Sequence, residues 1–170
     1  MIAISEQLQL NPRILHSVDD VNNAQKHVLF EKLMRHFHNQ LSGKTIALWG
    51  LAFKPRTDDI REAPALTLMR KAAGYGASCT AFDPVANDNA RAEMGPAATI
   101  VDDMYEALKG ADALIISTDW DEFKSPDFNK VKSLMKNPVI FDGRNLYRLH
   151  DMQQAGFTYY SVGRAPVKAK

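Results

Sequence analysis

The sequence has little that would cross-link the chain, anchor it in a membrane or give it a strong charge. Its 170 residues include one cysteine, Cys79, so no internal disulfide can form and a reducing compartment is favoured. No stretch approaches the ~20 consecutive apolar residues that span a bilayer, and residues 1–10 lack the basic start of a signal peptide. The 21 Lys and Arg side chains balance 20 Asp and Glu, which argues against a general affinity for nucleic acid. We therefore expect a cytoplasmic protein that binds neither nucleic acid nor membrane.

Glycine and proline are also too few for a low-complexity or collagen-like chain, at 9 and 8 residues. A hydrophobic share of 45% excludes a disordered chain, which could not support a core. The length fits one domain, or one domain with a long extension.

Residues 12–41 are expected to form one long helix. Asn11-Pro12 is a strong helix start, and no further proline or glycine occurs before Ser42-Gly43. A helix of ~30 residues would be a rod of roughly 45 Å. It either lies across its own domain or also forms a dimer interface, and the breadth of its apolar face favours the interface. The apolar residues at helical spacing are Ile14, Leu15, Val18, Val21, Val28, Leu29, Leu33, Phe37 and Leu41, with Phe30 and Met34 beside them.

From Lys44 onward, strand and helix patterns alternate. This alternation predicts an α/β fold: a Rossmann-like, doubly wound, mainly parallel sheet with helices on both faces. We expect a helix in residues 1–43, the sheet domain in 44–164 and a frayed tail in 165–170. The predicted strands are 45–49, 78–82, 99–101, 113–117, 139–141 and 157–162, and the predicted helices are 62–75, 86–94, 102–109, 128–136 and 150–155.

Ligands of such sheets bind beyond the carboxyl ends of the strands. After the first strand there is a single glycine, Gly50, in place of the G-x-G-x-x-G fingerprint that cradles a dinucleotide, and the long segment 51–61 follows it. Any phosphate bound here therefore needs side chains. The polar or turn segments at the strand ends are 50–55, 83–84, 117–120, 142–145 and 163–164.

The segment after Gly50 offers cations for this purpose. Lys54, Arg56 and Arg61 suit a phosphate or pyrophosphate. In that role the nearby acids Asp58, Asp59 and Glu62 would orient the bases by ion pairing. Residue types alone favour the alternative, a solvated charged loop. The same two interpretations apply to Arg144, which follows an Asp-Gly pair, whereas packing is the better interpretation for Trp120.

Catalytic and metal-binding patterns are sparse. Cys79 sits early in a predicted strand, which indicates a buried small side chain rather than a nucleophile. His36 and His38 point to different helix faces, and no histidine has a Cys or carboxylate partner at ligand spacing, so we expect no metal site. The adjacent acids Asp102 and Asp103 are explained as helix caps.

Several segments together resemble one family. Residues 50–64 (GLAFKPRTDDIREAP) are similar to the opening of the C-terminal, UDP-binding domain of the UDP-glucose/GDP-mannose dehydrogenase family. The helix segment 18–26 (VDDVNNAQK) resembles the central dimerisation helix of that family. The resemblance covers roughly residues 11–164. Two of its segments, 138–147 and 156–164, look most like those of bacterial UDP-glucose 6-dehydrogenases. The further matching segments, in order, are 81–85 (AFDPV), 111–120 (ADALIISTDW), 138–147 (PVIFDGRNLY) and 156–164 (GFTYYSVGR).

The resemblance implies roles for particular residues. Phe53 and Lys54 match positions that contact the UDP-sugar, and Arg144 matches an arginine on the substrate side. Arg61 matches an arginine that reaches the pyrophosphate of NAD. The family also implies a homodimer through the long helix, with an arginine of the partner helix at the substrate; Val28 stands at that position here.

The NAD-binding domain and the nucleophilic cysteine of the family are not in these 170 residues, and Cys79 matches no catalytic position, so no catalytic residue is assigned. We expect the C-terminal half of an NAD-dependent UDP-glucose 6-dehydrogenase, which oxidises UDP-glucose twice to UDP-glucuronate. This half, an excised domain or truncated gene product, should be inactive alone. The alternatives are the same half of a dehydrogenase for UDP-N-acetylmannosamine or GDP-mannose, or a stand-alone UDP-sugar-binding and dimerisation module.

Overall fold

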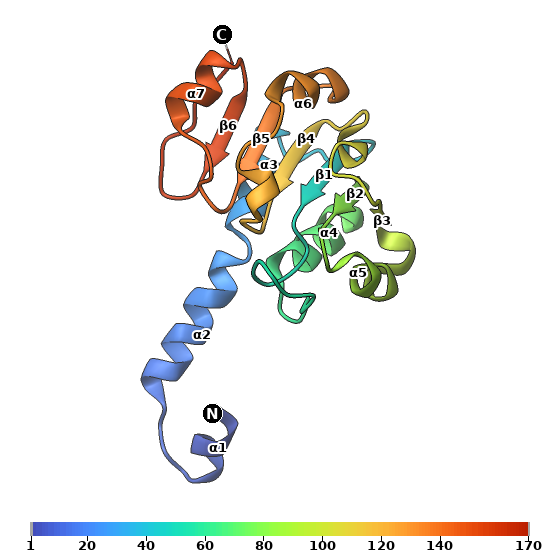
Figure 1. Ribbon diagram of the computed structural model, residues 1–170. Helices are drawn as coiled ribbons and strands as arrows, with labels where there is room; N and C mark the ends of the chain where they lie inside the picture. The colour runs from blue at the N-terminus through green and yellow to red at the C-terminus, as the bar shows by residue number, and fades with distance from the viewer. Residues whose placement is uncertain (1, 170) are drawn as a thin grey trace.

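A single parallel sheet of six strands organises the protein. The computed structural model describes residues 2–169 (Figure 1). The strand order is β3-β2-β1-β4-β5-β6, and every neighbouring pair is parallel. This order confirms the predicted doubly wound sheet and puts its topological switch between β1 and β4. The strands are β1 (Thr45–Trp49), β2 (Ser78–Phe82), β3 (Thr99–Ile100), β4 (Ala113–Ile116), β5 (Val139–Asp142) and β6 (Thr158–Ser161).

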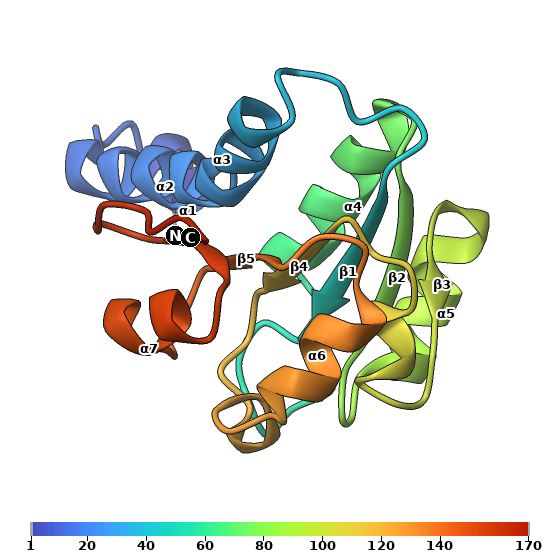
Figure 2. The ribbon, with the colours of Figure 1, turned by 90° about the horizontal axis from the view of Figure 1, so that it is seen from above.

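Helices cover both faces of the sheet. Alternate strand residues point to opposite sides, so each face presents apolar side chains that a layer of helices buries. In β1, Ile46 and Leu48 join one core with α3 (Val28–His36), α4 (Pro64–Gly74) and α5 (Asn87–Met94). Ala47 and Trp49 join the second core, on the side of α6 (Phe128–Leu134) and α7 (Leu149–Gln154). Figure 2 shows α4 and α6 on opposite sides of the sheet. The central strands are buried on both faces, as their continuous apolar sequences predict.

The long N-terminal helix is shorter than predicted. The chain is helical in α2 (Arg13–Gln25) and α3, with a turn at Lys26-His27 between them, and the helix ends at His36 instead of residue 41. His38 and Asn39 adopt positive φ angles of 51° and 61°, a conformation that no α-helix can continue. A short helix α1 (Ile2–Gln7), which the patterns did not predict, precedes α2.

Two further expectations are corrected. The helix predicted at residues 102–109 is only a 3₁₀ turn, Glu106–Leu108, because Gly110 follows with a positive φ and β4 starts soon after. The predicted frayed tail is held against the edge of the sheet, where Val167 and Tyr159 exchange two backbone hydrogen bonds in an antiparallel bridge.

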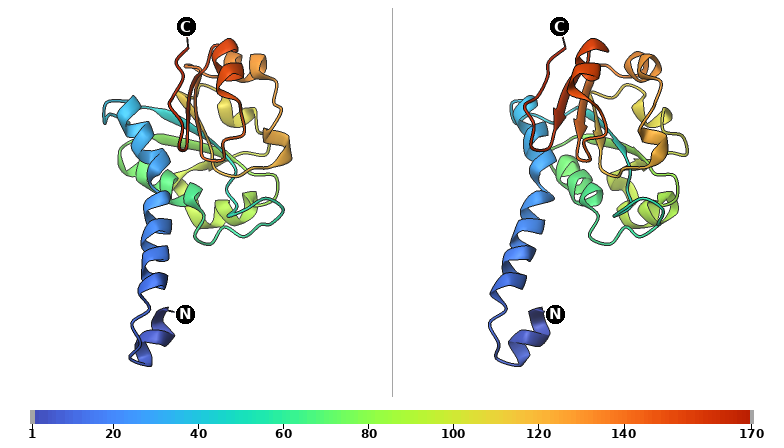
Figure 3. Two further views of the ribbon diagram at one scale, coloured as in Figure 1. Left: turned by 90° about the vertical axis from the view of Figure 1, so that its left-hand side faces the viewer. Right: turned by 60° about the vertical axis from the view of Figure 1, so that its left-hand side comes forward.

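The first part of the long helix leaves the domain. α2 buries none of its residues, whereas α3 buries Phe30, Leu33 and Met34 against the sheet. Figure 3 shows α2 extending away from the body of the domain, with α1 beyond it. Among residues 2–169, no helix combines the length and the apolar character that crossing a bilayer requires.

The packing of His36 predicts a pH dependence of stability. Its ring lies against Phe141 and Tyr160, and burial, with the nearby charges of His38 and Lys168, lowers its pKa below the ordinary value. The unfolded chain therefore binds the proton more readily, and stability should fall as pH drops from about 7 through the ordinary histidine pKa of about 6.5.

Thermal unfolding between pH 7.5 and about 5.5 tests this expectation. Tm should fall with pH, and the fall should be smaller in His36→Gln, which keeps a polar partner for the Tyr160 hydroxyl. His150→Gln, at an exposed histidine, is the control and should keep the wild-type slope. An equal slope in His36→Gln would refute the assignment.

Candidate functional site

A cleft of about 820 Å³ lies at the carboxyl ends of the strands, next to the topological switch point. One wall comes from the loops that follow β1, β4 and β5, and the other from the end of α2 and the start of α3. The predicted residues Phe53, Lys54 and Arg144 all line this cleft. Arg61 does not line it, although its neighbour Glu62 does.

The loop after β1 starts at a position that only glycine fits. Gly50 has a φ of 88°, and a Cβ there would lie 2.5 Å from the Cβ of Thr118. The Thr118 hydroxyl then donates to the carbonyl of Ala52 at 2.7 Å. The loops after β1 and β4 are thereby fixed to each other, immediately before Phe53 and Lys54.

Asp83, directly after β2, holds the same loop from the other side. Its fully buried carboxylate accepts five hydrogen bonds of 2.7–3.1 Å. Because every donor is drawn to one charge, three loops are joined at the point where the strands end. The donors are the amides of Leu51, Ala52, Val85 and Ala86, and the indole N–H of Trp120. Trp120 is therefore a packing residue, as predicted.

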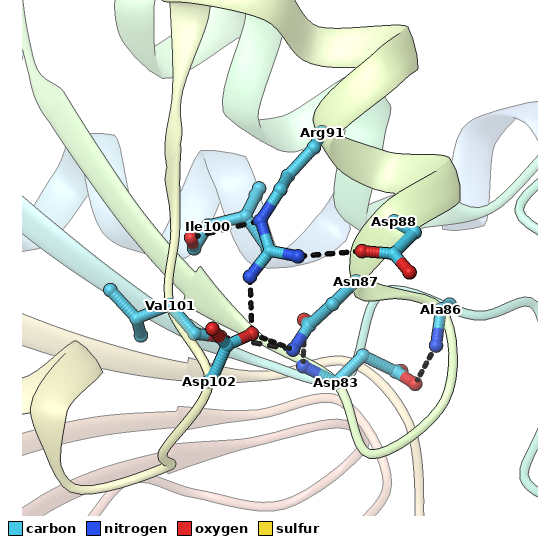
Figure 4. Close-up of polar contacts among 8 residues, drawn as sticks. All are labelled: Asp83, Ala86, Asn87, Asp88, Arg91, Ile100, Val101 and Asp102. Carbon is cyan, nitrogen blue, oxygen red and sulfur yellow. Dashed lines mark hydrogen bonds and ion pairs between the residues drawn. The ribbon is translucent and has the colours of Figure 1, made fainter.

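The surroundings of Asp83 leave no acid at the end of β2 for a cofactor ribose. Asn87 accepts from the amide of Asp83 and donates to the carbonyl of Val101 (Figure 4). Arg91 pairs with Asp88 and Asp102. A dinucleotide fold would use a free carboxylate here. Among the described residues, this corner therefore does not fit NAD.

Asp142, at the end of β5, shapes the loop that carries Arg144. This buried carboxylate accepts from the amides of Arg144 and Leu146 and from the Tyr159 hydroxyl, each at 2.7 Å. Burial, and next the charge of Asp142, raise the pKa of Tyr159 far above its ordinary value, so the phenol remains a donor. The backbone at Arg144 is thus fixed before any ligand arrives.

The Arg144 guanidinium lines the cleft and links the loops after β1 and β4. Its Nε donates to the carbonyl of Ser117 at 2.8 Å, and one terminal nitrogen donates to the carbonyl of Phe53 at 3.2 Å. Asp119 lies 3.7 Å from Nε. The other terminal nitrogen has no partner among residues 2–169, which leaves a charged donor for a ligand.

The remaining cations of the β1 loop differ in availability. Arg61 forms a bidentate pair with Asp59, which lowers the pKa of that carboxyl to about 2. Arg56 lies 3.5 Å from Asp121. Lys54 is exposed and, within the described chain, makes no hydrogen bond or ion pair. The expected ion pairing with the nearby acids is therefore found for Arg61 with Asp59, whereas Arg56 faces an acid of the segment after β4. Lys54 remains available to an anion.

Sequence reasoning missed the wall from the long helix. Asn22 and Lys26 line the cleft, and Lys26 pairs with Glu62 at the end of the β1 loop. This hydrogen bond lowers the pKa of Glu62. Asp83 and Asp142 were also not assigned roles, although each is an aspartate directly after an apolar strand, a pattern visible in the sequence.

Cys79 is confirmed as a buried side chain. Only 3% of it is exposed, and burial raises the pKa of its thiol to about 12, so it is protonated at neutral pH. In the described part of the chain, no three His, Cys, Asp or Glu side chains gather where they could hold a metal ion.

Comparisons with known proteins give a family match over more than half of the chain. Residues 47–149 match the profile of the "UDP-glucose/GDP-mannose dehydrogenase family, UDP binding domain". The chain is 43% identical over 169 residues to the UDP-glucose 6-dehydrogenase of Pseudomonas aeruginosa, covering 96% of this chain and 37% of that protein. It is 41% identical over 156 residues to UDP-glucose 6-dehydrogenase TuaD of Bacillus subtilis, covering 92% and 34%.

A solved UDP-glucose dehydrogenase from Pyrobaculum islandicum has a similar structure, with a TM-score of 0.79 at 30% identity. The alignment covers 96% of this chain and 35% of that one. The chain thus spans little more than a third of the length of the relatives it matches.

Asp83 provides a direct test of the loop architecture. Asp83→Asn should lower the free energy of unfolding by about 3 kcal/mol, because the amide has one acceptor oxygen and places N–H groups against N–H donors. Asp88→Asn, five residues along and with a 94% exposed side chain, is the matched control and should change stability little. Denaturant unfolding measures both, and equal effects would contradict the role of Asp83.

Proposed function

The chain belongs to the UDP-glucose/GDP-mannose dehydrogenase family as its UDP-binding domain, and we propose that it is the UDP-sugar-binding half of an NAD-dependent UDP-glucose 6-dehydrogenase. The observation that carries the proposal is the convergence of Phe53, Lys54 and Arg144 on one cleft. The parent enzyme would oxidise the sugar of UDP-glucose twice, to UDP-glucuronate.

The chemistry of the cleft suits a nucleoside diphosphate. Phe53 is 49% exposed and offers an apolar ring to the base or sugar. Lys54 and the unpaired nitrogen of Arg144 offer charged donors to the diphosphate. These three residues come from the loops after β1 and β5, which Asp83 and Asp142 hold in place.

The chemistry of oxidation lies elsewhere in this proposal. NAD would accept the hydrides, but the described chain has neither the glycine fingerprint nor a free acid at the end of β2. Its only thiol is the buried Cys79. Arg61, at the rim of the domain, would reach the NAD pyrophosphate by exchanging Asp59 for phosphate. We therefore expect no dehydrogenase activity from these 170 residues alone.

A second copy of the chain is the proposed partner of α2. Ile14, Val18 and Val21 are 80%, 52% and 59% exposed and border one apolar groove along this helix. Exposed apolar side chains at helical spacing favour association. The self-complementary face would bring two α2 helices together and bury this surface in a homodimer.

Titration calorimetry with UDP tests the ligand. The 170-residue chain should bind UDP, and Lys54→Ala should weaken binding by about 1.5–3 kcal/mol, the worth of a charge-assisted contact. Lys109→Ala, at an exposed lysine paired with Glu106, should leave the affinity unchanged. Equal UDP affinities of the wild type and both variants would show that Lys54 does not contact the ligand and belongs to a solvated loop.

Sedimentation tests the dimer. Val18→Glu should shift the protein to monomer, because two carboxylates would enter an apolar interface. Val85→Glu has a similar exposure, 53%, at a site far from α2 in the sequence, and should remain dimeric. A wild-type protein that sediments as a monomer at high concentration would overturn the proposal.

A further inference from the structure

Ser117 has an unusual hydroxyl. The residue is 7% exposed, and its Oγ is the one buried side-chain oxygen or nitrogen without a hydrogen-bond partner in the described chain. Buried hydroxyls are almost always paired, because leaving one unpaired costs free energy. An exception in a ligand cleft therefore calls for a partner supplied from outside.

The polar groups around this hydroxyl are already in use. The Ser117 amide donates to the carbonyl of Trp49 at 2.9 Å, and its own carbonyl accepts from Arg144. The hydroxyl of the next residue, Thr118, donates to Ala52. These groups already have hydrogen-bond partners within the fold, and the Ser117 Oγ alone among them has none.

The position of Ser117 identifies the missing partner. The residue lines the same cleft as Lys54 and Arg144, and the Arg144 guanidinium is bonded directly to its carbonyl. Because the carbonyl of the same residue accepts from the guanidinium, the Ser117 hydroxyl belongs to the segment next to the unused nitrogen of Arg144, and an anionic oxygen suits both donors. A neutral ligand oxygen would leave the charge of Arg144 without a counter-ion other than Asp119, 3.7 Å from Nε.

We propose that Ser117 is a ligand-binding residue whose hydroxyl donates to a phosphate oxygen of the nucleoside diphosphate held by Arg144. The assignment rests on the proposed function, since it requires a diphosphate in the cleft. Ser117 differs in this respect from the neighbouring Thr118, whose hydroxyl forms its hydrogen bond within the protein.

The proposal makes ligand affinity and stability change independently. Ser117→Ala removes a hydroxyl that has no partner in the free protein, so Tm should stay the same or rise. The affinity for UDP in calorimetry should nevertheless fall about tenfold or more. Ser161→Ala is the matched control, a buried serine whose hydroxyl accepts from Arg164 at 2.9 Å. It should lower Tm and leave UDP affinity unchanged.

Phosphorus NMR of bound UDP locates the contact. At saturation, one phosphorus resonance should differ between wild type and Ser117→Ala, and Ser117→Cys, a weaker donor, should fall between them. Wild-type affinity in Ser117→Ala, or a loss of affinity without any change in the phosphorus resonances, would overturn the proposal while the proposed function stands. A wild-type protein that fails to bind UDP would overturn both.

Discussion

The buried carboxylate of Asp83 is the interaction on which the site depends. A charge with no exposure to water is tolerable only when donors surround it, and five donors from three loops do so here. Each loop is thereby fixed relative to the others at the carboxyl edge of the sheet. Gly50 makes the arrangement feasible, since any side chain there would collide with Thr118. These contacts fix the backbone directly before Phe53 and Lys54 and so determine where both residues lie.

Asp142 repeats this arrangement at the end of β5, with β1 and β4 between the two sites. Both aspartates lie at the carboxyl end of a strand, are buried, and fix the next turn through backbone amides. In a dinucleotide-binding sheet, glycine-rich turns and a ribose-binding acid occupy such strand ends. Here the two aspartates accept hydrogen bonds from within the protein and are not available to a ligand. Ligand recognition therefore depends on other side chains of the loops. This exchange explains how a Rossmann-like strand order coexists with the absence of the glycine fingerprint from the sequence.

The doubly wound parallel sheet and the approximate positions of its strands could be predicted, because alternating apolar strands and helix-boundary residues are local signals. Lys54 and Arg144 could be proposed for the site because they follow strands whose carboxyl ends share an edge. The break at Lys26-His27, the stop at His36 and the reduction of residues 102–109 to a 3₁₀ turn depend on packing and on φ angles that the pattern does not encode. The roles of Asn22 and Lys26 required knowing where the end of the α2 helix lies relative to the loops at the strand ends.

The ion pairs and hydrogen bonds within the cleft also limit which ligand groups this domain can recognise. Most of its charged side chains are already paired: Lys26 with Glu62, and Arg144 with backbone carbonyls near Asp119. The cationic groups left for a phosphate are Lys54 and one nitrogen of Arg144, and the proposed third donor is the Ser117 hydroxyl. These are donors suited to phosphate oxygens, and none of them distinguishes one hexose from another. The side-chain amides of Asn22, Asn23 and Gln25 also line the cleft. In the proposed function, contacts to the sugar would come from groups such as these, whereas Lys54 and Arg144 would supply the affinity for the diphosphate.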